Sequence, residues 1–192
     1  LESWRAVSEF DAVGFSLQFE LTFTNILTML ELGGIALRSA DRDDDAPLIL
    51  AGGPTATHAE PIAPFLDALV IGDGEEKTPE ILLTWSALKA AGMPRRERLV
   101  ELAKLGGVYV PSLYETELEA ETGMQVVRAP SAPELPFPIE RAMVDDLNAH
   151  PFPHGGPVAS TETIFDRVSV EIARGCTEGC RFCQAGMIYR PL

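Results

Sequence analysis

The fold is decided by the stretch Pro47-Leu48-Ile49-Leu50-Ala51-Gly52-Gly53-Pro54, where an unbroken apolar run ends in a glycine–proline break. An apolar run without alternation predicts a strand that is buried on both faces, and the glycines predict a sharp turn after it. Two similar runs flank this segment, at 10–17 and 68–71, and Gly72-Asp73-Gly74-Glu75 follows the second. The sequence therefore predicts three short buried strands, each of which ends in a turn.

Helices are expected between these strands and after the last one. The segment 22–32 has an apolar face and ends at a Gly-Gly pair, a short helix is expected at 58–65, and a longer one at 76–91 with Asp73 as its cap. This alternation predicts an α/β fold built on a Rossmann-like parallel sheet. In such sheets ligands bind at the edge where the strands have their carboxyl ends. Because only three strands are evident, we expect the first strands of the sheet upstream of Leu1.

The chain changes character after residue 93. A helix is expected at 95–105, a short strand at 107–111 and a hairpin within 114–128, and a proline-rich connector covers 129–157. The alternating segment 166–172 predicts a strand that leads into a cysteine-rich loop. We therefore divide the chain into an incomplete Rossmann-like domain at 1–93, a connector with helix and hairpin at 94–165, and the start of another domain at 166–192.

Composition limits the classes of protein to which the chain can belong. Of its 192 residues 46% are hydrophobic and 23% are charged, which is ordinary for a soluble globular protein. No apolar run reaches the roughly 18 residues of a membrane helix, and the N-terminus does not resemble a signal peptide. The net charge of −14 argues against general affinity for nucleic acid or anionic membranes.

All three cysteines lie in the loop Arg174-Gly175-Cys176-Thr177-Glu178-Gly179-Cys180-Arg181-Phe182-Cys183. An odd, clustered set indicates metal ligation in a reducing compartment, so we expect a cytoplasmic protein. Three thiolates are typical ligands of an iron–sulfur cluster and leave one iron of a cubane open to a small molecule. The alternatives are a structural zinc site completed by His150 or His154, and three unrelated buried cysteines.

The C-x3-C-x2-C spacing, with Phe182 just before the third cysteine and Arg-Gly before the first, resembles the radical S-adenosylmethionine superfamily. The resemblance implies that Cys176, Cys180 and Cys183 bind a [4Fe–4S] cluster and that Phe182 lies near the adenine of S-adenosylmethionine. It also implies reductive cleavage of that cofactor to a 5′-deoxyadenosyl radical, with electrons from a donor such as a flavodoxin or ferredoxin.

The same resemblance bears on the architecture. It implies that 166–192 is the first strand and cluster loop of a partial (β/α) barrel, which needs roughly 200 residues. We therefore expect that the 192-residue chain does not catalyse turnover by itself.

The glycine-rich turns upstream resemble the cobalamin-binding Rossmann-like domain that precedes many radical S-adenosylmethionine cores. That resemblance implies cobalamin-dependent methyl transfer, and it implies a groove for the nucleotide tail of cobalamin lined by Ser16, Leu17, Gly52, Gly53, Pro54, Gly72, Gly74 and Glu75. The cobalt-binding motif Asp-x-His-x-x-Gly is absent from the sequence. Each glycine turn taken singly also fits a plain joint between a strand and a helix. A cobalamin- or cluster-binding regulatory or scaffold module without catalysis is the alternative function.

Overall fold

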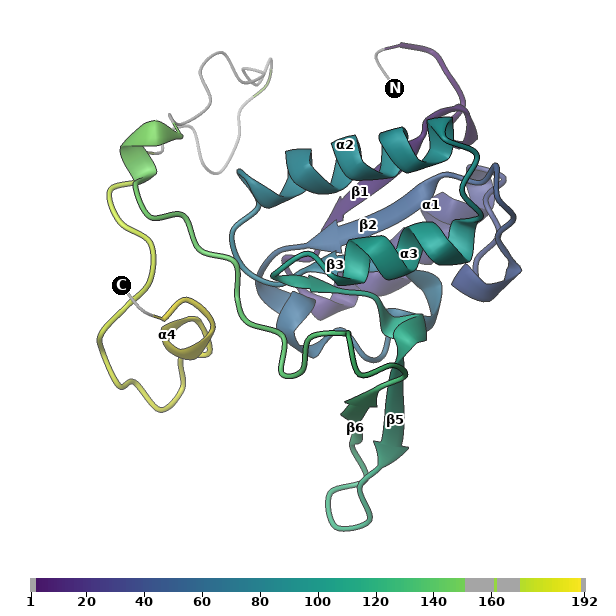
Figure 1. Ribbon diagram of the computed structural model, residues 1–192. Helices are drawn as coiled ribbons and strands as arrows, with labels where there is room; N and C mark the ends of the chain where they lie inside the picture. Colours follow the sequence, from purple (N-terminus) through teal and green to yellow (C-terminus); the bar gives the residue numbers. More distant parts are fainter. Residues whose placement is uncertain (1–2, 151–160, 162–169, 191–192) are drawn as a thin grey trace. The chain divides into compact units, whose positions relative to one another are not determined.

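The computed structural model describes residues 3–150, 161 and 170–190 (Figure 1). Contacts between residues divide the chain into two compact units, Leu1–Met143 and Val144–Leu192. The strand predicted at 166–172 lies largely outside the described residues, as do His154 and the part of the proline-rich connector at 151–157. Within the described residues no helix is long and apolar enough to cross a membrane.

Unit 1 is built on a four-stranded sheet with the order β1-β2-β3-β4. The strands are β1 (Ala12–Ser16), β2 (Leu48–Gly52), β3 (Ala68–Val70) and β4 (Val108–Tyr109). The first three are parallel, as predicted, and β4 pairs antiparallel with β3. A connection with one helix brings the next strand back parallel to the previous strand. Two helices lie between β3 and β4, so the chain enters β4 from the opposite end of the sheet. The α/β, Rossmann-like fold class is confirmed.

The three long helices are α1 (Phe23–Leu32), α2 (Lys77–Ala90) and α3 (Arg95–Ala103), close to their predicted ranges. Figure 1 shows α2 and α3 in front of the strands. The single helix predicted at 58–65 is wrong, because the chain there contains two 3₁₀ turns, η4 (Pro54–His58) and η5 (Ala63–Phe65). Pro61 and Pro64 lack the amide hydrogens that a continuous helix needs.

The predicted cap of α2 is also wrong. Glu76 occupies the cap position and makes no side-chain capping hydrogen bond, whereas the carboxylate of Asp73 binds Arg141 at 3.1 Å. The remaining short elements are η1 (Val7–Glu9), η2 (Glu20–Thr22), η3 (Ser39–Asp41), η6 (Pro111–Leu113), η7 (Leu147–Ala149) and α4 (Ala185–Ile188).

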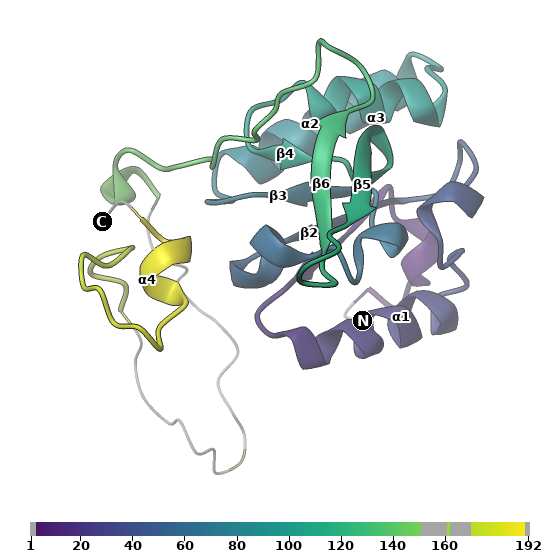
Figure 2. The same cartoon turned by 90° about the horizontal axis from the view of Figure 1, so that it is seen from below.

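The segment after β4 forms a hairpin and then returns to the sheet. The hairpin strands are β5 (Tyr114–Leu118) and β6 (Gln125–Pro130), which overlap the sheet strands in the view of Figure 2. The returning segment 139–143, which we call the strap, reaches the sheet where Ala142 forms a parallel bridge with Gly72. Since α3 packs beside α2 and β4 pairs with β3, the predicted boundary at residue 93 falls inside unit 1. The division into functional domains stays a prediction.

A buried carboxylate joins the elements of unit 1. Asp67, directly before β3, is 1% exposed and forms ion pairs with Arg42 at 3.0 Å and Arg95 at 2.6 Å. It also accepts hydrogen bonds from the Ile49 amide at 2.7 Å and from the Ser39 hydroxyl at 2.5 Å. Burial lowers the pKa of Arg42, and the charge of Asp67 opposes that shift. The carboxylate thus links η3, β2, the start of β3 and α3.

Replacing this carboxylate should destabilise unit 1 strongly. We expect Asp67→Asn to lower the free energy of unfolding by about 3–5 kcal/mol, because it leaves buried arginine charge without its partner. Asp11→Asn is the matched control, since Asp11 pairs with Lys89 on the surface and should cost less than about 1 kcal/mol. Urea unfolding followed by circular dichroism measures both. Equal midpoints for the two variants would contradict the role given to Asp67.

Candidate functional site

The predicted groove residues at the ends of β1 and β2 do come together. Ser16 lies in register with Gly52, and the Leu17 amide donates a hydrogen bond to the Gly52 carbonyl at 2.6 Å. Both the amide and the hydroxyl of Thr55 donate to the Leu17 carbonyl at 3.0 Å. Leu17 is fully buried, and the chain turns into η4 at Pro54. These residues therefore bind mainly to one another.

Two glycines in the predicted groove approach other parts of the same chain. Gly53 has a φ of +107°, and a Cβ there would lie 3.0 Å from the Leu17 carbonyl oxygen. Gly72 has a φ of +113°, and its Cβ would lie 2.1 Å from the Ala142 carbonyl oxygen. Both conformations favour glycine, and at Gly72 no side chain fits.

The remaining groove residues lie at the start of α2. The Gly74 carbonyl accepts a hydrogen bond from the Thr78 amide at 2.9 Å, and Glu75 is half-buried. The close approach at Gly72, which the resemblance assigned to a cobalamin tail, is made by the strap. The described geometry therefore gives cobalamin no support, and the eight groove residues stay predicted ligands only.

The cysteine loop lies in unit 2. Cys176 and Cys183 are half-buried, Cys180 is exposed, and all three are free thiols. The Cys183 amide donates to the Cys180 carbonyl at 3.1 Å, and the Glu178 amide contacts the Cys176 sulfur at 3.4 Å. The loop is followed by α4, and the Arg190 guanidinium donates to the carbonyls of Glu178 and Gly186.

This loop has suitable ligands but does not hold them in a metal-binding arrangement. Within the described residues no three side chains of His, Cys, Asp or Glu converge as a metal-binding group. His150 therefore does not complete a zinc site with the cysteines in this structure. A cavity of about 420 Å³ beside the loop is lined by Cys180, Cys183, Phe182 and Arg190 among others. Phe182 is 91% exposed. Three free thiols in one short loop nevertheless fit the donor set of an iron–sulfur cluster.

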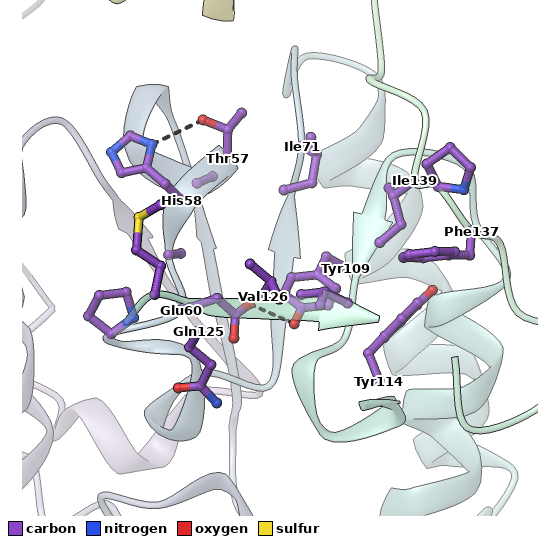
Figure 3. A pocket seen from close by; sticks show the side chains of 16 residues that line it. Thr57, His58, Glu60, Ile71, Tyr109, Tyr114, Gln125, Val126, Phe137 and Ile139 are labelled. Atoms are coloured by element: carbon purple, nitrogen blue, oxygen red, sulfur yellow. Dashed lines mark hydrogen bonds between the residues drawn. The ribbon is translucent and has the colours of Figure 1, made fainter. Parts of the chain in front are cut away.

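A larger cavity in unit 1 was missed by the sequence analysis. It measures about 690 Å³ and lies between η4, the end of β3, β4 and the hairpin (Figure 3). Inside it the Tyr109 hydroxyl donates a hydrogen bond to Glu60 Oε1 at 2.7 Å. The Tyr114 hydroxyl donates to the Pro136 carbonyl at 2.8 Å. No motif marks these residues, because they come from separate segments that only the fold brings together.

Burial acts on both tyrosines of this cavity. It raises the pKa of Tyr109 above its ordinary value, and the hydrogen bond to Glu60 and the charge of that carboxylate raise it further. Burial likewise raises the pKa of Tyr114. The two hydroxyl groups therefore stay protonated at neutral pH and act as hydrogen-bond donors.

Comparison with known proteins gives a family and a curated relative. The family described as "Radical SAM proteins, N-terminal" matches residues 1–111, more than half of the chain. An uncharacterized protein of Methanocaldococcus jannaschii is 24% identical over 192 residues, which cover all of this chain and 34% of the relative. The chain thus spans about a third of the length of that relative. No solved structure matches the chain.

The strap contact at Gly72 can be tested by substitution. We expect Gly72→Ala to lower the free energy of unfolding by about 2 kcal/mol or more, because the backbone is strained and the added Cβ overlaps Ala142. Gly106→Ala is the control, since nothing lies within 4 Å of a Cβ at this exposed turn. Urea unfolding compares the two. A fully stable Gly72→Ala variant would show that the strap does not pack here.

The buried tyrosines should make stability fall at alkaline pH. Their pKa values are raised in the folded state, so above about pH 10 the unfolded chain loses these protons while the folded chain keeps them. Each tyrosine then lowers the free energy of unfolding by up to about 1.4 kcal/mol per pH unit.

The measurement is urea unfolding between about pH 8 and about pH 11, with Tyr109→Phe beside the parent chain. In the variant the free energy of unfolding should fall less steeply with rising pH, because phenylalanine has no proton to release. An unchanged slope would mean that Tyr109 is not buried as described.

Proposed function

The chain belongs to the family described as "Radical SAM proteins, N-terminal", and we propose that the whole protein is a radical S-adenosylmethionine enzyme. The observation that carries the proposal is the pairing of this family match with the C-x3-C-x2-C loop. The match ends at residue 111, so the loop is an independent line of support. Cys176, Cys180 and Cys183 are the proposed ligands of a [4Fe–4S] cluster.

The cluster, when bound, supplies an electron for the reductive cleavage of S-adenosylmethionine. The chain's own residues would bind and orient these groups. The exposed ring of Phe182 offers an apolar face for the adenine, and Arg190 holds Glu178 and Gly186 through their carbonyls. Arg190 therefore acts as a positioning residue for the loop.

The partners follow from this chemistry. An electron donor such as a flavodoxin or ferredoxin is required, and the proposed cellular location is the reducing cytoplasm. Cobalamin-dependent methyl transfer stays a prediction, and the close approach that it assigned to a ligand at Gly72 is made by the strap. A regulatory or scaffold module would assemble the cluster without cleaving the cofactor, and a structural zinc protein would bind zinc in its place.

Metal analysis of the full-length protein after anaerobic reconstitution with iron and sulfide tests the cluster. We expect about four irons per chain, and loss of most of that iron in Cys176→Ala, Cys180→Ala and Cys183→Ala. Thr177→Ala is the control, because it alters the same loop without removing a thiol.

Electron paramagnetic resonance of the reduced protein then tests the reaction class. The signal should shift on addition of S-adenosylmethionine, and 5′-deoxyadenosine should form. An unshifted signal with no product would leave only cluster binding and so favour the scaffold module. Retention of zinc instead of iron would overturn the proposal.

A further inference from the structure

The large cavity of unit 1 has the size and position of a small-molecule site. Its volume of about 690 Å³ falls within the roughly 300–1,000 Å³ that is usual for such sites. It is lined by η4, which follows β2, and by Ile71, which follows β3. Those positions lie beyond the carboxyl ends of two parallel strands, where α/β sheets bind their ligands.

One side of the cavity is aromatic. The rings of Tyr109 and Tyr114 meet edge to face with centroids 5.2 Å apart, and the centroid of Phe137 lies 6.5 Å from that of Tyr114. Figure 3 shows Phe137 and Tyr114 on one side and His58 on the other, with Glu60 and Tyr109 meeting between them. This wall suits a flat apolar group.

The charge of the lining selects the polar part of a ligand. Glu60 is the only carboxylate of the lining, and none of the lining residues is Lys or Arg. Tyr109 donates to Oε1 of Glu60, and Oε2 has no hydrogen bond to the described residues. The imidazole of His58 lies 2.9 Å from Glu20, which adds a second carboxylate beside the lining. An anionic ligand would meet no Lys or Arg here, and the one histidine of the lining, His58, already faces the carboxylate of Glu20, whereas an ammonium group finds an acceptor in Glu60.

From this arrangement we infer that the cavity binds a small organic amine, with its apolar body against Tyr109, Tyr114 and Phe137 and its ammonium group on Glu60. A protonated amine also gains from nearby aromatic faces. The site lies wholly within unit 1, so it goes beyond the proposed radical chemistry and does not depend on the cysteine loop.

A matched pair of probes tests the inference on the 192-residue chain. The probes are 2-phenylethylamine and 3-phenylpropionate, which share a phenyl ring and differ in charge. Ligand-observed NMR titration should give a dissociation constant for the amine at least about tenfold lower than that for the carboxylate, as expected for one charged hydrogen bond.

Two variants address the two parts of the site. Glu60→Gln keeps an acceptor for Tyr109 but removes the charge, so the preference for the amine should fall to less than about threefold. Val126→Trp fills the cavity from the hairpin and should weaken amine binding by about fivefold or more. Glu115→Gln, an exposed change on the same hairpin outside the cavity lining, should leave binding unchanged.

Circular dichroism melting separates lost binding from lost folding. If Glu60→Gln does not fold, Val126→Trp still decides whether the cavity is the site. Absence of saturable amine binding by the parent chain would overturn the inference. So would equal or tighter binding of 3-phenylpropionate, or amine binding that both folded variants leave unchanged.

Discussion

The architecture of unit 1 depends on the buried carboxylate of Asp67. It pairs with Arg42 and Arg95, and the guanidinium groups of Arg95 and Arg98 lie over the ring of Trp85, at 5.2 and 4.3 Å from its centroid. Two buried arginine charges thus depend on a single acid, an arrangement that is costly unless each group keeps its partners. Because Asp67 also accepts the Ile49 amide, its position fixes where β3 begins beside β2.

The placement of β3 in turn sets the carboxyl edge of the sheet. Gly72 follows β3, and the strap hydrogen-bonds to both of its neighbours: the Ala142 amide donates to the Ile71 carbonyl at 2.8 Å, and the Asp73 amide donates to the Ala142 carbonyl at 2.9 Å. Ile139, at the start of the strap, is part of the wall of the large cavity. The buried ion pairs and the cavity are therefore connected through β3 and the strap, although no residue belongs to both.

The local sequence pattern was sufficient to predict β1, β2, β3 and the long helices, because apolar runs and glycine turns determine the structure of the few residues that contain them. It failed where the partner is distant in sequence. The turn at Gly72 indicated a close approach, but only the fold shows that Ala142 makes it. The convergence of Glu60, Tyr109 and Tyr114 also arises from long-range packing, for which a single sequence gives no signal.

The two candidate sites differ in how far the chain organises them by itself. In the cavity the Glu60–Tyr109 hydrogen bond and the aromatic wall are present without a ligand, so binding there needs little ordering of side chains. In the described part of the cysteine loop the thiols do not converge as a metal site, and metal binding would supply the free energy that orders them. The geometry of the cavity therefore forms together with the fold of unit 1 and does not depend on the cysteine loop.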